Sequence, residues 1–347
     1  MSCKAEAVLG AREAGSESLE EAWVDSDLDR CERLTHEGLL VAQGATMGAE
    51  RARLLLTYAL SIGLRGQLSG AVRNLQESEA LFRDLRMQPQ RALALANLAE
   101  LLGWQGEHDD AWARADEAVR LTGEIGYRLG RIVSLRARGV ASLDLGRHAD
   151  ALRDLREAAR GASEIQVHEE LVAAEVALVR LCLAAGDGLG AMRHGARALQ
   201  AANERDTEQY LPLLQALLAR SLAVRRPRVA ANLLRAAADA VPSLRVARRL
   251  QVQLALAAAA LAIGDRIGGI DHAERLLRDR AVRAFRAIQL EARTLLADAT
   301  TGEIAQRHRR LGQELSREDT DTGPSISHDD ASPPGPALGE IPDETGL

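Results

Sequence analysis

The chain has 347 residues, 46% of them hydrophobic but only 2% aromatic, so a core must be built mainly from Ala, Leu and Val, which favours helices over a sheet. The formal net charge is -6 and most of the excess acid follows Ser316, so the remainder is near neutral, which argues against a nucleic-acid surface. The three scattered cysteines favour a reducing, cytoplasmic setting without a disulfide framework or zinc site, and we find no apolar run typical of a signal peptide or membrane span.

A glycine recurs every 40 residues through the middle of the chain, at Gly66, Gly106, Gly146 and Gly186. A small residue follows five positions after each glycine, and again where Arg226 replaces the glycine: Ala71, Ala111, Ala151, Ala191 and Ala231. Each unit contains two apolar helical runs, as in residues 91–131. This internal period predicts an array of stacked helical hairpins.

In chain order, residues 1–17 are expected to be a flexible N-terminus, and 18–25 a shortened first helix or cap before a second helix over 27–43. The following first helices are expected over 50–64, 90–104, 130–145, 169–185 and 208–224. Their second helices are expected over 68–86, 108–124, 148–164, 188–203 and 228–240. The period then shortens to 38 between breaks at Gly264 and Gly302, which gives first helices over 244–262 and 281–299 and second helices over 267–279 and 302–316.

The composition changes from Arg317 onward to an acidic one rich in Pro, Gly and Ser, with almost no apolar periodicity. Such a segment buries too little apolar surface to offset the entropy lost on ordering. We therefore expect one helical repeat domain over residues 18–316, with about seven hairpins, and a disordered tail over 317–347.

The small residues of the hairpins follow a further pattern. Those of the first helices fall at Ala59, Ala99, Gly139, Val179 and Ala219, and a second small position of the second helices falls at Ala118, Ala158, Ala198 and Ala238. In these positions the unit resembles the tetratricopeptide repeat (TPR) over about residues 27–316, in the long-period variety found in kinesin light chains and in arrays associated with bacterial regulators and kinases. The aromatic residue that the family often has in the first helix appears only as Tyr58, and the chain departs from the family at the matching positions Leu98, Arg138 and Leu178. The resemblance implies an all-α solenoid, a right-handed superhelix of antiparallel hairpins.

The resemblance also implies a concave groove, lined by the first helices, that holds a peptide, a helix or a partner domain. Carried over by position, the groove residues are Arg53, Leu56, Leu60, Leu93, Ala96, Glu100, Trp104, Val133, Arg136, Val140, Val176, Arg180, Leu213, Ala216 and Arg220. Among them, Arg136, Arg180 and Arg220 would form a basic strip that favours an acidic ligand, since guanidinium groups bind carboxylates through paired hydrogen bonds. The alternative is that these arginines are solvated or paired with Asp144 and Glu175.

Other candidate sites have simpler structural explanations. His108 and His148 occupy equivalent places after a break, but no carboxylate or Cys joins them at ligand spacing, so we expect surface residues and no metal. Cys182 is expected to be a packed thiol. The basic run at residues 307–310 suits either an acidic surface or a helix C-terminus. A separate hypothesis, from charge alone, has the acidic tail folding back onto the arginine strip.

These features predict a non-enzymatic, cytoplasmic scaffold or adaptor that binds a protein or peptide in the groove, without a cofactor, nucleic acid or membrane. The alternative is the TPR sensor or regulatory portion of a bacterial signalling system that works beside a kinase or transcription regulator. An enzymatic interpretation lacks paired acids and a histidine at usable spacing.

Overall fold

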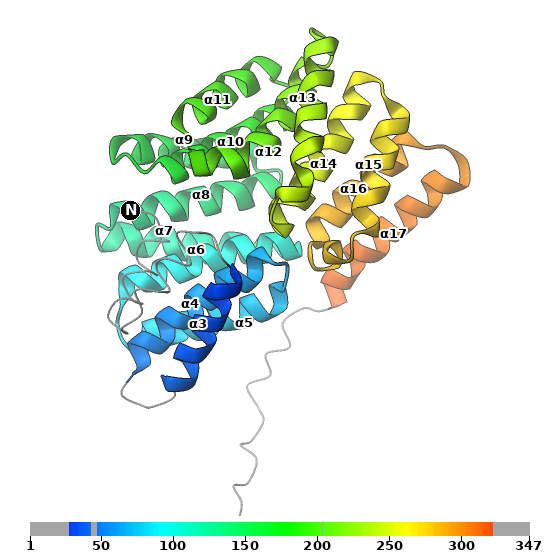
Figure 1. Cartoon of the computed structure of the whole chain (residues 1–347). Helices are drawn as coiled ribbons and strands as arrows, with labels where there is room; N and C mark the ends of the chain where they lie inside the picture. Colours follow the sequence, from blue (N-terminus) through cyan, green and yellow to red (C-terminus); the bar gives the residue numbers. More distant parts are fainter. Residues whose placement is uncertain (1–27, 43–46, 203, 322–347) are drawn as a thin grey trace, which may run out of the picture.

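The computed structural model describes residues 28–42, 47–202 and 204–321, which form helices and short connections and contain no strand (Figure 1). Consecutive helices pair into antiparallel hairpins that stack on one another, which confirms the predicted all-α solenoid. The expected flexible N-terminus over 1–17, the cap over 18–25, and residues 322–347 of the expected tail lie outside the described residues.

The helices begin and end close to the breaks that the sequence marks. In chain order they are α3 (Leu28–Val41), α4 (Gly48–Leu64), α5 (Leu68–Asp84), α6 (Gln88–Gln105), α7 (His108–Glu124), α8 (Arg128–Asp144), α9 (His148–Glu164), α10 (His168–Ala184), α11 (Gly188–Ala201), α12 (Glu204–Leu222), α13 (Pro227–Ala240), the 3-10 helix η1 (Val241–Ser243), α14 (Val246–Ile263), α15 (Arg266–Arg278), the 3-10 helix η2 (Arg280–Ala284), α16 (Arg286–Ala299) and α17 (Gly302–Asp321).

Apart from α12, which begins at Glu204 instead of residue 208, two helices differ from the sequence prediction by four residues or more. The helix expected over 281–299 is divided at Phe285, whose φ of -102° and ψ of 72° are not helical, and this break turns the ring into the core. The last helix, α17, continues to Asp321 instead of ending at residue 316. The 40-residue period does not predict either of these differences.

The glycines at the predicted breaks have left-handed backbone conformations, which side chains disfavour. The φ angle is +88° at Gly66, +91° at Gly106 and +72° at Gly146. The same conformation recurs between hairpins at Arg86 and Gln166, with φ of 57° and 58°. The turn between hairpins is therefore imposed by its place in the repeat, even where the residue is not glycine.

Gly146→Ala is expected to lower the free energy of unfolding by about 1 kcal/mol. Its φ is +72°, and a Cβ atom there would meet nothing within 4 Å, so the backbone conformation accounts for the loss. Gly103→Ala is the matched control, because Gly103 lies inside α6 and also has open space around it; alanine there should raise the same free energy by about 0.5 to 1 kcal/mol. Urea denaturation followed by circular dichroism measures both, and a loss at both positions would contradict this explanation.

Small residues hold the two helices of each hairpin close together. The recurring alanines Ala71, Ala111 and Ala151 are fully buried. A Cβ atom added at Gly139 would lie 2.7 Å from Leu155 Cγ. Even one methyl group would therefore push α8 away from α9, which is the reason that the repeat places small residues there.

Arg–Glu pairs repeat with the same period of 40 in the first full hairpins. Each joins the start of a first helix to its own second helix: Arg51 to Glu77, Arg91 to Glu117, and Arg131 to Glu157. The Arg131 Nη2 to Glu157 Oε1 distance is 2.8 Å. Since both side chains of that pair are partly exposed, it fixes the register of the two helices more than it stabilises them.

Arg138 stands where the family pattern has an apolar residue, and it is neutralised by carboxylates from both flanking helices. Its Nε donates to Asp154 Oδ2 of α9 at 2.7 Å, and its Nη1 donates to Asp116 Oδ1 of α7 at 2.7 Å. Burial by itself would lower the pKa of Arg138, but hydrogen bonds to Asp154 and Asp116 raise it. Arg138 thus stays charged and links three consecutive helices.

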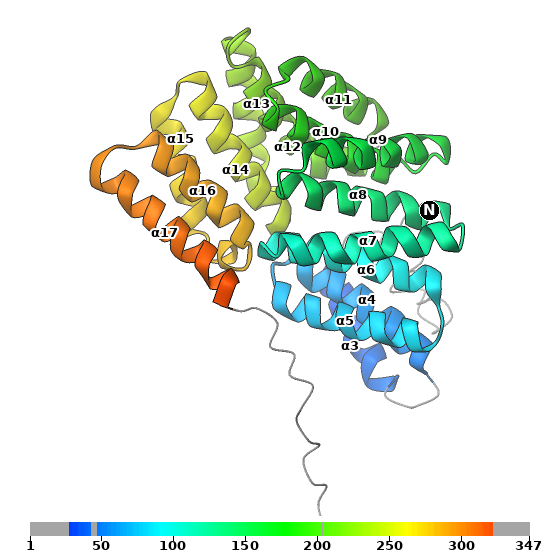
Figure 2. The ribbon, with the colours of Figure 1, turned by 180° about the vertical axis from the view of Figure 1, so that it is seen from behind.

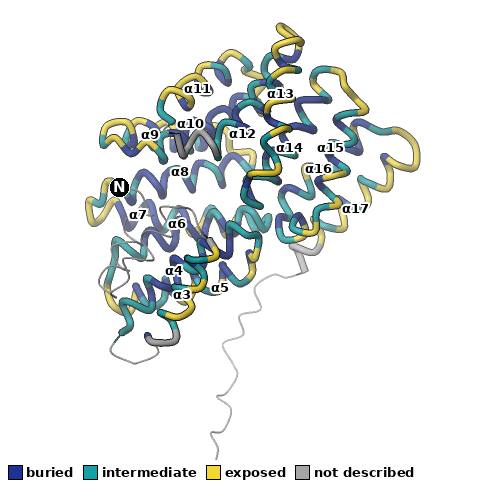
Figure 3. Tube along the Cα trace, in the orientation of Figure 1, coloured by how far each residue is buried: buried dark blue, intermediate teal, exposed yellow. Residues whose placement is uncertain are grey.

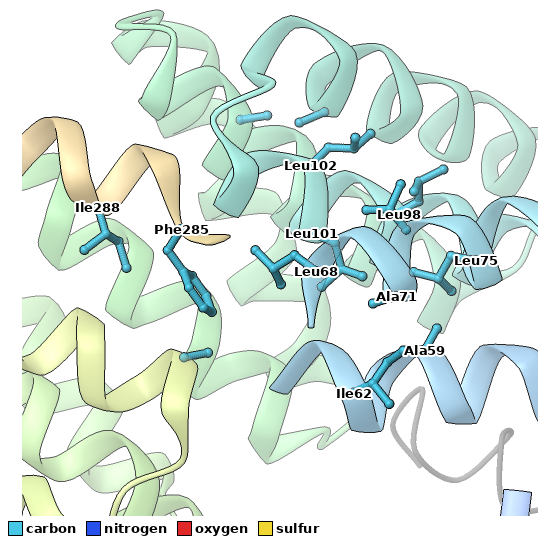
Figure 4. Close-up of a cluster of buried hydrophobic side chains, with 14 of the residues drawn as sticks. Ala59, Ile62, Leu68, Ala71, Leu75, Leu98, Leu101, Leu102, Phe285 and Ile288 are labelled. Atoms are coloured by element: carbon cyan, nitrogen blue, oxygen red, sulfur yellow. The ribbon is translucent and has the colours of Figure 1, made fainter. Parts of the chain in front are cut away.

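The last hairpins turn back onto the first ones, so that the curved array closes on itself (Figures 1 and 2). α14 contacts α4 and α16 contacts α6. Phe285, 1% exposed, belongs to one buried cluster with Leu68, Leu101 and Leu102 (Figure 4). Its ring centroid lies 5.7 Å from that of Trp104. We call this contact between the two ends of the array the closing contact.

One helix among the described residues, α14, is long and apolar enough to cross a membrane by length and composition. In this structure it packs against α12, α15 and α16. Its apolar side chains, among them Leu250, Val252 and Leu256, are buried in that packing.

Candidate functional site

The first helices of the hairpins face the inside of the curve, and the second helices lie outside. α6 contacts α8, α8 contacts α10 and α10 contacts α12, so the first helices form one continuous layer. Exposed residues gather on the outer helices α9, α11 and α13, whereas α6, α8 and α10 are largely buried (Figure 3). The charged and aromatic side chains of the first helices interact across this inner side, and we call this set the inner wall: Glu100, Asp144, Arg136, Glu170, Arg180, Tyr210, Arg220, Arg248 and Glu291.

Arg136 is the centre of the first group on the inner wall. Its Nε donates to Glu170 Oε2 of α10 at 2.8 Å, and its Nη1 lies 3.4 Å from Glu100 Oε2 of α6. Its side chain is 14% exposed. Burial alone would lower the pKa of Arg136, but Glu170 and Glu100 raise it well above its ordinary value. The guanidinium is therefore permanently charged and joins three first helices.

Tyr210 of α12 continues this group toward α14. The guanidinium of Arg248 lies 4.1 Å from the centroid of the Tyr210 ring, a distance typical of a cation–π contact. Burial raises the pKa of Tyr210, with Arg248 opposing. The phenol stays neutral at physiological pH and can both donate and accept a hydrogen bond.

A second charged group lies further along the same layer. Arg180 Nη2 donates to Asp144 Oδ1 at 3.0 Å, and the Arg180 side chain is 37% exposed. Glu291 of α16 interacts electrostatically with Arg180, Asp144 and Arg220. Burial among protein groups raises the pKa of Glu291, with Arg180 opposing. Side chains from α8, α10, α12 and α16 therefore converge, although α16 is more than 100 residues from α10 in the sequence.

The structure brings several predicted groove residues together. Glu100, Arg136, Arg180 and Arg220 all belong to the inner wall, and Arg220 is exposed. The three arginines do not form an unpaired basic strip, since Arg136 and Arg180 each bind carboxylates of the chain itself. The proposed pairing of Arg180 with Asp144 is present, whereas Glu175 instead contacts His194, at 2.6 Å.

The remaining predicted groove residues lie elsewhere. Trp104 packs in the closing contact, and Leu60, Val140 and Arg53 are half-buried. The apolar positions expected to face a ligand are at most 5% exposed, which corrects that expectation: Leu56, Leu93, Ala96, Val133, Val176, Leu213 and Ala216. They are buried because the first helices pack against one another as well as against their own second helices.

Four inner-wall residues were not identified from the sequence, namely Glu170, Tyr210, Arg248 and Glu291. The spacing of charged residues along the chain gave a partial indication of the inner wall. Two inner-wall pairs, Glu100 with Arg136 and Asp144 with Arg180, are separated by 36 residues, one helical turn less than the period. No comparable spacing points to Glu291, because it reaches the wall through the closure of the array.

The described residues contain no group of three or more His, Cys, Asp or Glu side chains that would hold a metal ion. His108 and His148 are the first residues of α7 and α9. Cys182 is buried, and burial raises the pKa of its thiol, which disfavours the reactive thiolate.

No protein-family model and no curated protein sequence matches the chain. Solved structures do match in fold. A Rap protein complexed with competence and sporulation factor has a TM-score of 0.65 at 12% identity, over 86% of this chain and 81% of that one. A Rap conjugation gene regulator of a plasmid, in complex with a Phr peptide, has a TM-score of 0.61 at 14% identity, over 86% and 87%. Aspartyl phosphate phosphatase F from Bacillus subtilis has a TM-score of 0.58 at 11% identity, over 87% and 78%. By its fold, the chain is a TPR-like repeat protein whose consecutive helical hairpins form an α-solenoid.

Proposed function

We propose that the chain is the regulatory TPR-like module of a bacterial signalling system, acting in the cytoplasm, and that it binds a short charged peptide on the inner wall. The observation that carries the proposal is the gathering of charged side chains from α8, α10, α12 and α16 on the inner side of the curve, where the Arg180–Asp144 ion pair lies within electrostatic range of Glu291. Two solved structures of similar fold are complexes, one with competence and sporulation factor and one with a Phr peptide.

The alternating charges of the inner wall suit a ligand that carries both signs. An incoming carboxylate can replace Asp144 as the partner of Arg180, and an incoming cation can replace Arg180 beside Glu291. Such exchanges conserve the number of ion pairs, so the net preference is set by how well the ligand matches the geometry. The inner wall is therefore expected to select peptides with a matching pattern of charges, instead of attracting any acidic molecule.

A general adaptor would be supported by the same wall, but the similar solved structures favour a regulator. We propose a non-enzymatic role, in which a bound peptide changes the binding of a signalling partner to the chain. One of the similar structures is aspartyl phosphate phosphatase F, and a phosphatase assay on the full chain tests for that activity.

Selection of random phage-displayed hexapeptides on the immobilised full chain tests the proposal. The dissociation constants of enriched peptides are then measured by fluorescence anisotropy for the wild type and for Arg220→Glu. Arg220 is exposed, and its charge is close enough to Glu291 to lower the pKa of that carboxyl group. Charge reversal is expected to weaken binding about tenfold or more, equivalent to ~1.4 kcal/mol.

Arg120→Glu is the matched control, since the Arg120 side chain is 68% exposed on the outer helix α7. It makes the same charge change away from the inner wall and should leave binding unchanged. Peptides that lose affinity equally in both variants, or a library that gives no enriched binder, would count against the inner wall. Affinity capture of cellular proteins with and without the enriched peptide then separates a regulator, whose partner recovery responds to peptide, from an adaptor, whose recovery does not.

A further inference from the structure

The face between α16 and α17, the last two helices, contains a cavity of about 420 Å³. Its floor is apolar, with Leu290 and Ala297 of α16. Its rim carries Arg293, His308 and Arg309, and among the described residues that line it Asp298 is the one acid. It is separate from the inner wall and shares no residue with it.

The cationic groups of this cavity are incompletely satisfied. Arg293 Nε and His308 Nδ1 are both buried and have no hydrogen-bond partner. Burial lowers the pKa of Arg293, and Arg307 lowers it further; burial and then Arg293 lower the pKa of His308. Arg293 Nε lacks an acceptor and its charge is repelled by Arg307, with Glu314 opposing, an arrangement that an acidic ligand would relieve.

The segment that follows the cavity in the sequence has the complementary composition. Residues 322–347 contain Asp329, Asp330, Glu340, Asp343 and Glu344 but no Lys or Arg. The acidic residues Glu340, Asp343 and Glu344 lie close to the apolar residues Leu338 and Ile341, a composition that matches an apolar floor with a basic rim. This segment begins directly after α17, whose residue Arg317 also lines the cavity.

We propose that residues 338–344 of the same chain dock in the cavity between α16 and α17, with the apolar side chains on its floor and the carboxylates at Arg293 and Arg309. About 17 residues separate the end of α17 from Leu338, a length that spans up to ~56 Å when extended. A tether of this length gives an effective concentration on the order of millimolar. Even a weak contact is therefore occupied in the intact chain.

The same acidic segment was also a candidate to cover the arginines of the inner wall. That location is less favourable, since Arg136 and Arg180 already bind Glu170 and Asp144. A docked carboxylate there would have to displace a carboxylate of the chain. At Arg293 it would instead supply an acceptor that is missing.

Nuclear magnetic resonance of the ¹⁵N-labelled full chain tests the docking. The amide signals of residues 338–344 are compared with those of the isolated synthetic peptide 322–347. A docked segment tumbles with the 37.3-kDa chain, so its signals should shift and broaden, while Arg309→Glu should return them to the positions of the isolated peptide. Glu340→Gln/Asp343→Asn/Glu344→Gln should release the segment from the other side of the contact, so that its signals match those of a synthetic peptide with the same three changes. This variant keeps the test valid if Arg309→Glu fails to fold.

Arg128→Glu is the control, because its side chain is 68% exposed and lies far from the cavity in the sequence and on a different helix. It should leave the signals of the wild-type chain unchanged. Signals that coincide with those of the isolated peptide in the wild type would overturn the proposal. So would shifts that survive Arg309→Glu, or shifts that vanish on dilution and thus belong to the tail of a second copy.

Discussion

Phe285→Ala should lower the free energy of unfolding by about 3 to 5 kcal/mol, as expected for a fully buried aromatic side chain. Phe285 is 1% exposed and its ring packs against Trp104. A Cβ atom at Gly66 would lie only 3.2 Å from Phe285 Cε2, so the ring fills the space beside α4 closely. Its loss would leave a cavity between helices that are distant in sequence, where the hairpins have no chain connection to hold them together.

This variant should also open the array, since stacked hairpins otherwise contact only their neighbours. Small-angle X-ray scattering should show a larger radius of gyration. The tryptophan fluorescence, to which Trp104 contributes, should shift toward that of a solvated indole. Phe82→Ala is the matched control: Phe82 is fully buried in the same cluster but comes from α5, away from the closing contact. It should lower stability by a similar amount without changing the separation of the two ends. A loss below about 1 kcal/mol for Phe285→Ala would contradict the closing contact.

The closing contact also matters for the inner wall. Glu291 reaches Arg180 and Arg220 only because η2 and the break at Phe285 place α16 opposite α10 and α12. A variant that opens the array would separate these charges. Peptide binding and the integrity of the closing contact are therefore expected to be lost together.

Asp154→Ala should also lower the free energy of unfolding by about 3 to 5 kcal/mol, because it removes one partner of a buried ion pair. Asp154 is 1% exposed and accepts from Arg138 Nε at 2.7 Å and from Arg138 Nη2 at 3.1 Å. The variant would leave the Arg138 charge between α8 and α9 with Asp116 as its remaining carboxylate partner. Chemical denaturation followed by circular dichroism measures the loss.

Two comparisons make this prediction specific. Asp150→Ala removes a carboxylate that is 50% exposed and pairs with Arg153 on the same helix, and it should cost less than about 1 kcal/mol. The double variant Arg138→Leu/Asp154→Leu removes the guanidinium as well as the carboxylate and should be more stable than Asp154→Ala, in which Arg138 keeps only Asp116 as a carboxylate partner. A double variant as unstable as the single one would show that packing, not the lost partner of Arg138, causes the loss.

The sequence by itself determined the local parts of this protein. The recurring glycines, from Gly66 to Gly186, marked the ends of the first helices. Each glycine itself has the left-handed conformation of the turn after the helix, and this conformation favours a residue without a side chain. The recurring alanines marked the faces on which paired helices meet. Both features depend on contacts within one hairpin or between neighbours, and a repeating sequence records such contacts in every unit.

Only the tertiary structure decided what the charged residues do. Arg136 and Arg180 were visible as a possible basic strip, but their partners come from other repeats, and Arg138 is satisfied by residues on both flanking helices. The turn at Phe285 and the approach of Glu291 depend on closure between helices about 200 residues apart, α4 with α14 and α6 with α16. A 40-residue period describes how each hairpin meets the next one, and it carries no information on where the curve brings the two ends together.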